Sequence, residues 1–312
     1  MSGAPGMSTA VVFGEALVDD FQSEQVVGGA PFNVARHLAA FMAKVAVITR
    51  IGDDKSGQLV RAEFERFVMS EAGLQVDALE ETGRVLVERG PRGHRFTILP
   101  NQAYDFIDRA AAVASVEGVT PGFVYFGMLA QRHEVSRGAL KGILDSNVAP
   151  RFLDLNLRDG QYDERGVTRS LQAANIVKVN EEELQVLFGW YFQIKPDDPP
   201  LAADEVHASC QALLKMFSLD ALIVTLGHRG SVYFDSEGRV LTQRDHPAPP
   251  FVIDTVGAGD AFAAIFLLGR MRDWPLETSL SRANEFAGAI CAIPGAVPRD
   301  MGFYDKWMTR WR

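Results

Sequence analysis

Short apolar runs alternate along the chain with longer segments in which apolar residues recur at helical spacing. Each run is about as long as a buried strand, and the runs lie at residues 10–13, 45–48, 123–126, 152–155, 176–177 and 221–224. One segment between runs carries a stripe that would occupy one face of a helix, formed by Val206, Cys210, Leu213, Leu214 and Phe217. Such alternation is typical of βαβ units, so it predicts an α/β fold on a mostly parallel sheet.

Two segments interrupt the alternation and read as extended ribbon. They lie at about residues 17–27 and 83–99, and the second contains the turn sequence RGPRG at 89–93. We expect these two excursions to meet as a small β-lid on a single α/β domain that spans residues 7–312. Exposed strand edges on such a lid favour self-association as a homodimer.

Composition narrows the class of protein. The chain has 312 residues, of which 47% are hydrophobic, enough for a sizeable core. Its net charge of −9 disfavours sequence-independent electrostatic binding to nucleic acid or to an anionic membrane surface. The apolar run at 261–268 is far shorter than the roughly 20 residues that span a bilayer. Two cysteines and an N-terminus without a secretory pattern predict a cytoplasmic location.

The most informative segment for chemistry is DTVGAGDAF at residues 254–262, which leads directly into an apolar helical segment. A glycine-rich turn at a helix start presents free backbone N–H groups and the positive end of the helix dipole, which suit a transferring phosphoryl group. Asp260 lies just beyond the turn, where its carboxylate can take a proton from a hydroxyl aimed at that phosphorus. The alternative is an ordinary strand–turn–helix junction with Asp260 as a cap.

This segment resembles the second signature of the PfkB family of ribokinase-like sugar kinases. Residues 28–35 (GGAPFNVA) resemble the first signature, 180–183 the family's N-x-x-E motif, and 224–230 its nucleotide loop. The resemblance covers about residues 11–298 and implies a ribokinase-like fold, a central sheet with helices on both faces. Segments 14–19, 126–132 and 154–158 are similar to fructokinases. The resemblance therefore implies ATP-dependent phosphorylation of a sugar, with fructose as the first candidate for the substrate.

The resemblance also assigns roles to residues. For catalysis it implies Asp260 as general base, with the backbone N–H groups of Gly257, Ala258 and Gly259 holding the phosphoryl group. For the sugar it implies Asp19, Gly28, Gly29, Asn33 and Arg158. For ATP it implies Asn180, Thr225, Gly227, Gly230 and Asn284. It implies Mg²⁺ near Glu183, and a monovalent cation such as K⁺ near Asp254 and the carbonyls around Gly295.

Several alternatives stay open. Asp19 can be a solvated acid beside Asp20, N-x-x-E also begins a helix as a capping motif, and Asn284 can be an ordinary helical residue. Residues 97–105 lack the aromatic–Arg pair that many fructokinases carry after the ribbon turn, and Arg299 stands where a relative has a small hydroxyl residue. The acceptor can instead be ribose, 2-keto-3-deoxygluconate or a nucleoside, or the chain can be a catalytically idle sugar sensor.

Overall fold

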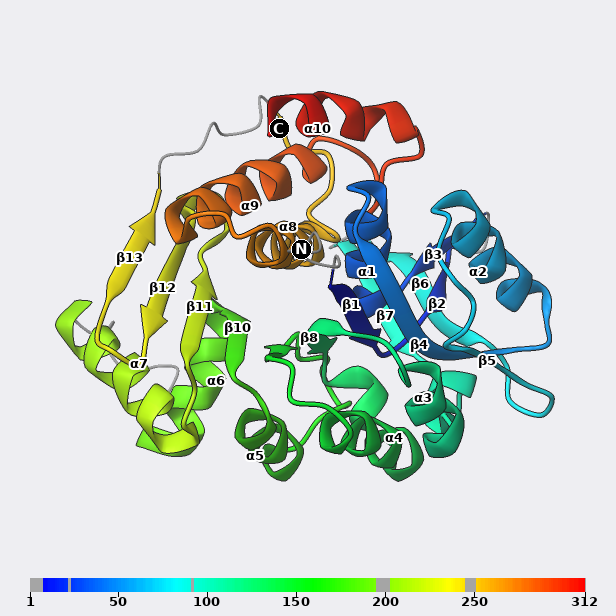
Figure 1. The fold of residues 1–312 in the computed structure, drawn as a ribbon, viewed down its shortest axis with the longest axis horizontal. Coiled ribbons are helices and arrows are strands. Elements are labelled where there is room, and N and C mark those ends of the chain that lie inside the picture. The colour runs from blue at the N-terminus through cyan, green and yellow to red at the C-terminus, as the bar shows by residue number, and fades with distance from the viewer. Residues whose placement is uncertain (1–7, 22–23, 91–92, 195–202, 245–250, 312) are drawn as a thin grey trace, which may run out of the picture.

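A nine-stranded sheet forms the centre of the molecule (Figure 1). The structure is a computed structural model and describes residues 8–21, 24–90, 93–194, 203–244 and 251–311. The strand order is β13-β12-β11-β10-β9-β8-β1-β4-β5, in which only β12 and β13 pair antiparallel to their neighbours. The strands are β1 (Thr9–Phe13), β4 (Lys44–Gly52), β5 (Leu74–Asp77), β8 (Pro121–Phe126), β9 (Arg151–Asp154), β10 (Ile176–Asn180), β11 (Ala221–Thr225), β12 (Ser231–Asp235) and β13 (Val240–Gln243).

All six apolar runs of the sequence coincide with strands, apart from Leu155, which follows the last residue of β9, so the predicted mostly parallel α/β fold is confirmed. Side chains of β1 alternate between two separate cores: Val11 and Phe13 face one, Ala10 and Val12 the other. Both faces of the sheet are therefore covered, which explains why the parallel strands read as continuous apolar runs.

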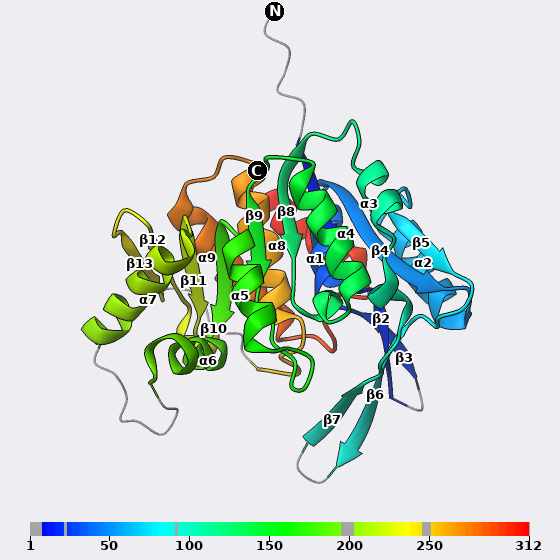
Figure 2. The ribbon, with the colours of Figure 1, turned by 90° about the horizontal axis from the view of Figure 1, so that it is seen from below.

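Helices cover the two faces of the large sheet (Figures 1 and 2). One layer contains α1 (Ala30–Ala40), α2 (Lys55–Arg66), α8 (Ala258–Met271), α9 (Leu276–Ile290) and α10 (Asp305–Arg310). The other contains α3 (Arg109–Ser115), α4 (Glu134–Asp145), α5 (Glu164–Ala173), α6 (Glu181–Phe192) and α7 (Ala203–Phe217). Four short 3-10 turns complete the helical elements of the described chain: Ala103–Phe106, Leu129–Gln131, Gly227–Arg229 and Met301–Tyr304.

Helix α8 is buried along most of its length. Every residue from Asp260 to Gly269 is buried, as expected for a helix that is apolar on all sides. It packs against α9 and α1, which brings the glycine-rich turn at its start close to the first signature in α1.

A separate four-stranded sheet forms from the two segments that interrupt the alternation. Its order is β3-β2-β6-β7, with β2 parallel to β6 and the other pairs antiparallel. Figure 2 shows β6 and β7 extending away from the large sheet and its helices. Residues 91–92 of the RGPRG turn lie outside the described residues. We call this the small sheet; its strands are β2 (Leu17–Asp20), β3 (Gln25–Gly28), β6 (Gly83–Gly90) and β7 (Gly93–Ile98).

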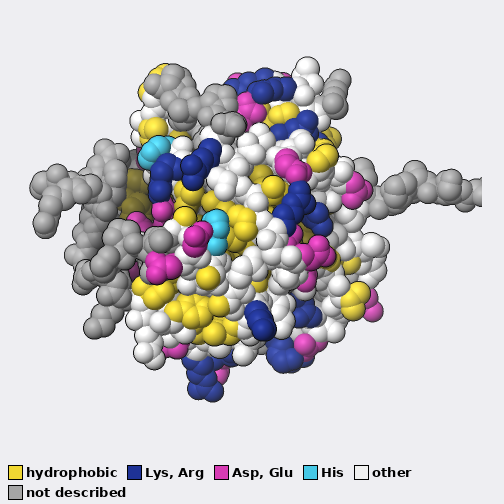
Figure 3. All heavy atoms as spheres, turned by 90° about the vertical axis from the view of Figure 1, so that its left-hand side faces the viewer, with side chains coloured by type: hydrophobic (Ala, Val, Ile, Leu, Met, Phe, Trp, Pro, Cys, Tyr) yellow, Lys and Arg dark blue, Asp and Glu magenta, His cyan; other side chains and the backbone are white. Residues whose placement is uncertain are grey.

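Two further observations bear on partners. Within the described ranges, no helix combines the length and hydropathy needed to cross a bilayer. On the face at the β13 edge, basic and acidic side chains alternate with hydrophobic ones (Figure 3). Among the described residues visible in that view, no extended patch carries a single charge sign.

Candidate active site

The candidate site begins where the first turn of α8 meets α1. Asp260 is buried there, and its Oδ2 accepts a 2.7 Å hydrogen bond from Nδ2 of Asn33. These two residues come from the two glycine-containing signatures of the sequence, which lie far apart along the chain. The fold thus brings the predicted base and a predicted sugar-binding amide into direct contact.

Burial raises the pKa of Asp260 from 3.8 to about 6. The Asn33 hydrogen bond works in the opposite direction, Asp154 adds to the rise, and the cations of Lys178 and Arg158 reduce it. A carboxyl with this pKa is ionised at neutral pH yet basic enough to take a proton, which suits a general base.

The turn before α8 needs glycine for a physical reason. Gly257 has φ 76°, and a Cβ at this position would lie 2.3 Å from Cβ of Ala296. The N–H of Ala258 donates to the carbonyl of Thr255 at 3.3 Å. This bond draws one of the three predicted phosphoryl-binding amides toward the loop in this structure.

A buried ion pair, which the sequence did not predict, lies beside the turn. Nζ of Lys178 in β10 binds both carboxylate oxygens of Asp154 in β9, at 2.9 and 3.0 Å, and the Tyr125 hydroxyl donates to the same carboxylate at 3.2 Å. A Cβ added to Gly259 would lie 3.2 Å from that ammonium. Lys178 therefore places a positive charge against the glycine-rich turn. A lysine in the middle of a buried strand is rare, and that anomaly was the available signal.

The sugar-side residues form an acidic group around one arginine. Burial raises the pKa of Asp19 in β2 to about 6, against the pull of Arg158 and Arg36. Glu15, just after β1, is fully enclosed, and burial raises its pKa to about 7. Arg158 acts electrostatically on Glu15, Asp19 and Asp260 alike. Glu15 belongs to a segment that resembles fructokinases, but the sequence assigned it no role.

The glycine pair of the first signature allows close backbone approach. A Cβ on Gly28 would lie 2.8 Å from Oδ2 of Asp19, and one on Gly29 would lie 2.4 Å from the carbonyl oxygen of Glu15. These glycines let β3 and the start of α1 approach the acidic group.

On the proposed nucleotide side, Asn180 and Glu183 form a capping box at the start of α6. The Asn180 side chain accepts from the Glu183 N–H at 2.8 Å, and the Glu183 carboxylate accepts from the N–H groups of Asn180 and Leu157, both at 2.9 Å. This is the capping alternative named for the N-x-x-E motif. Because each carboxylate oxygen has two lone pairs, Glu183 keeps acceptor capacity beyond these bonds.

The other predicted nucleotide residues have structural contacts of their own. Thr225 ends β11 and donates to the carbonyl of Val179 at 3.3 Å. A Cβ on Gly230 would lie 2.0 Å from the carbonyl oxygen of Gln243, whereas Gly227 has open space around it. Asn284 is buried rather than exposed, and its amide donates to the hydroxyl of Ser231 at 3.0 Å. That bond ties α9 to β12.

The predicted cation residue Asp254 joins two loops. One of its carboxylate oxygens accepts from the N–H of Val256 at 3.0 Å and the other from the N–H of Gly295 at 3.1 Å. No group of three or more His, Cys, Asp or Glu side chains suited to a metal occurs in the part of the chain that the structure describes. The single carboxylate of Glu183 fits Mg²⁺, which normally takes only one or two carboxylates together with water and phosphate oxygens.

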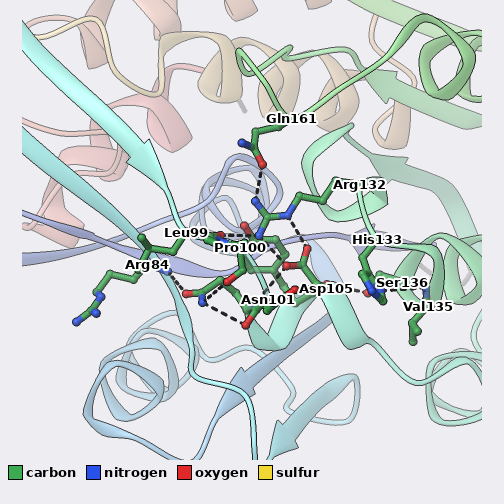
Figure 4. A network of polar contacts seen from close by, with 12 residues as sticks. Arg84, Leu99, Pro100, Asn101, Asp105, Arg132, His133, Val135, Ser136 and Gln161 are labelled. Atoms are coloured by element: carbon green, nitrogen blue, oxygen red, sulfur yellow. Dashed lines mark hydrogen bonds and ion pairs between the residues drawn. The ribbon is translucent and has the colours of Figure 1, made fainter.

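A cavity of about 400 Å³ lies beside the segment that follows the small sheet. Arg132 forms part of its wall and organises the network in Figure 4: it donates to both oxygens of Asp105, to the carbonyl of Leu99 and to the side chain of Gln161. None of the site residues implied by the sequence lines this cavity. Arg132 thus provides a guanidinium near a segment that lacks the expected aromatic–Arg pair.

Known proteins resemble this chain over nearly its whole length. The family model described as "pfkB family carbohydrate kinase" matches residues 7–299. Fructokinase-1 of Oryza sativa subsp. japonica is 29% identical, over 94% of this chain and 95% of its own length. Aminoimidazole riboside kinase of Salmonella typhimurium is 27% identical, over 93% of this chain and 91% of its own.

A solved structure shares the fold. The fructokinase of Vibrio cholerae O395, in its fructose-, ADP- and calcium-bound form, has a TM-score of 0.77 and 23% identity, covering 93% of this chain and 94% of its own. The family match spans nearly all of the chain, and the chain belongs to the pfkB family of carbohydrate kinases.

Proposed function

We propose that this carbohydrate kinase transfers the γ-phosphoryl group of ATP to a hydroxyl of fructose, with Asp260 as general base. The observation that carries the proposal is the buried Asn33–Asp260 contact at the start of α8, with a carboxyl whose pKa is about 6. The fructokinase names among relatives at 27–29% identity support fructose as the acceptor.

In the proposed reaction, Asp260 accepts the proton of the sugar hydroxyl as its oxygen bonds to the γ-phosphorus. The bond from that phosphorus to the β,γ-bridging oxygen breaks, and ADP leaves. The N–H groups of Gly257, Ala258 and Gly259 would stabilise the charge on the phosphoryl oxygens, and the ammonium of Lys178 would add positive charge beside them.

The remaining residues would bind and orient. Asp19, Gly28, Gly29, Asn33 and Arg158 would hold the sugar, and Asn180, Thr225, Gly227, Gly230 and Asn284 would hold ATP. Mg²⁺, when present with the donor phosphates, would be held by Glu183 and water and would neutralise phosphate charge. Asp254 and the carbonyls near Gly295 would take K⁺.

We further propose that the small sheet is a lid over the sugar. Its strand β2 carries Asp19, whose carboxylate, like that of Asp260, interacts electrostatically with Arg158. Closure of this sheet would exclude water, which otherwise competes with the sugar for the phosphoryl group.

A substrate panel with a coupled ADP assay, run with and without K⁺, tests the proposal. We expect fructose to give the highest kcat/KM. Preference for a riboside would favour the second candidate, a nucleoside kinase, which the aminoimidazole riboside kinase relative supports. Ribose and 2-keto-3-deoxygluconate complete the panel. Sugar binding without any ADP release would instead identify a catalytically idle sensor and contradict the proposal.

A further inference from the structure

Arg36 in α1 occupies a position that neither the sequence motifs nor the family match explains. We propose that Arg36 is a positioning residue: its guanidinium fixes the Asn33 amide so that the NH₂ group faces Asp260 and one carboxylate oxygen of the base is held. This inference rests on the proposed role of Asp260 as general base.

Two successive hydrogen bonds connect the guanidinium of Arg36 to the carboxylate of Asp260 through Asn33. Nη2 of Arg36 donates to Oδ1 of Asn33 at 2.5 Å, and Nδ2 of Asn33 donates to Oδ2 of Asp260 at 2.7 Å. Within the described residues, no donor binds Oδ1 of Asp260, so that oxygen remains for the proton of the acceptor hydroxyl.

The orientation of the Asn33 amide follows from its two neighbours. An amide has an oxygen that only accepts and an NH₂ group that only donates. If the amide turned over, its NH₂ would face the donors of Arg36 and its oxygen would face the carboxylate of Asp260. Arg36 has no acceptor in any state at physiological pH, so it excludes the turned form.

Two other acceptors hold the guanidinium in place. Nη1 donates to Glu63 in α2 at 2.7 Å, and Nη2 also donates to the carbonyl of Val27 in β3 at 2.9 Å. Val27 belongs to the edge strand of the small sheet. The same guanidinium therefore contacts the small sheet and α2 directly and the base through Asn33.

Arginine is a costly choice for this position. Arg36 is 3% exposed, its Nε has no partner among the described residues, and burial lowers its pKa below the usual range. An apolar side chain on this face of α1 would avoid that desolvation. The planar fork of donors explains the presence of arginine, since the directed bonds to Asn33, Val27 and Glu63 help to offset the cost.

Several other titratable groups lie around this network, and a test must distinguish their titration from that of Asp260. Those that act electrostatically on Asp260 or are acted on by it are Glu15, Tyr125, Asp154, Arg158 and Lys178. Those around Arg36 are Asp19, His37, Glu63, Arg66 and Tyr304. His37 has a pKa lowered to about 3, chiefly by burial, so it stays neutral at working pH. The pKa values of Glu15 and Asp19, about 7 and about 6, are similar to that of Asp260, so the test needs a signal from Asp260 itself.

The test compares Arg36→Met with Glu63→Gln in the full-length protein. The carboxyl ¹³C signal of Asp260, assigned by its loss in Asp260→Asn, gives the titration midpoint, and ADP release gives kcat and its pH profile. We expect Arg36→Met to raise the titration midpoint of Asp260, and the pH at which kcat reaches half of its maximum, by about one pH unit. We also expect this variant to lower kcat about 10- to 100-fold. Glu63→Gln should lower the melting temperature but leave both midpoints unchanged, since Arg36 still binds Asn33.

Arg36→Lys provides the graded comparison and the second variant if Arg36→Met does not fold. It keeps the charge without the planar pair of donors, so it should shift the midpoint in the same direction but less. An unchanged Asp260 midpoint in both Arg36 variants, with Asp260→Asn inactive, would overturn this inference and leave the proposed function standing. Full turnover in Asp260→Asn would instead refute the proposed function.

Discussion

At the scale of single residues, burial sets the charge of the carboxyls in the candidate site. Asp19, Glu15 and Asp260 have pKa values raised to about 6, 7 and 6, and burial is the largest cause in each case. Arg158 is the cation that acts on all three. A site with this charge balance suits a neutral polyhydroxyl acceptor better than an acceptor that already carries phosphate, because the carboxylates would repel the phosphate.

The raised pKa of Asp260 predicts the pH dependence of the reaction. The base acts only when ionised, so kcat should rise with pH through about 6 and level off above it. The measurement is the pH profile of ADP release at saturating fructose and ATP. A profile that is flat between pH 5 and 8 would show that Asp260 does not limit the reaction.

The same shift predicts that the base destabilises the fold. The pKa of Asp260 is about 6 in the folded protein, above its ordinary value of 3.8, so ionisation of this carboxyl lowers the free energy of unfolding. The full loss is present above about pH 6, and it disappears as the pH falls below 3.8, the pKa expected in the unfolded chain. Asp260→Asn should therefore increase the free energy of unfolding at pH 8 by about 1–3 kcal/mol. Urea unfolding at pH 8 measures the difference; a variant less stable than the wild type at pH 8 would contradict the prediction.

The sequence indicates Asp260 and Asn33 as candidate site residues, but it does not indicate Arg36 or Lys178. The first two lie in glycine-containing motifs with a recognisable chemistry. The role of Arg36 depends on Glu63 and Val27, and that of Lys178 on Asp154 and Gly259, which are distant in sequence. Contacts of this kind follow from the packing of helices and strands, which local patterns do not encode.

At the scale of elements, the start of α8 depends on one backbone conformation. Gly257→Ala places a side chain at φ 76° and against Ala296, so we expect a loss of about 2–4 kcal/mol in stability and a strong loss of turnover. The matched control is Gly238→Ala, at φ 89° with nothing within 4 Å of the added Cβ. That control should lose only about 1 kcal/mol and keep full activity. Equal effects of the two substitutions would show that the contact with Ala296 is unimportant.

The pairing of β9 with β10 contains a second testable contact. Lys178→Met leaves the carboxylate of Asp154 buried without its cation, which should cost about 3–5 kcal/mol. The double variant Lys178→Met/Asp154→Asn removes both charges and should recover most of that loss. Urea unfolding of the two variants measures it. A double variant as unstable as the single would mean that the loss arises from packing rather than charge.

Elements with strong apolar patterns were predictable from sequence, and weakly patterned ones were not. The runs in β1, β8 and β11 are buried on both faces and contain little polar interruption. Strands β5 and β13 are edge strands with partly exposed side chains, so they carry no comparable pattern. The N-x-x-E motif supports both a cap and a phosphate contact, and the cap is the role visible in this structure.

At the scale of the whole molecule, the residues of the proposed site come from both sheets. The large sheet and its helices hold the proposed base and the proposed nucleotide residues, and the small sheet carries Asp19. Arg36 links the two through Val27. Strands β3 and β7 are the outer strands of the small sheet as far as the structure describes it, so we propose that two chains associate along them as a homodimer.

One comparison tests the central claim most directly: ADP release by wild type and Asp260→Asn at saturating ATP over a range of fructose concentrations. The account predicts that the variant loses about 10²- to 10⁴-fold in kcat, the usual contribution of a positioned base, while fructose affinity changes little. The stability measurement at pH 8 shows that the variant is folded. Near-normal kcat in the folded variant would contradict the account.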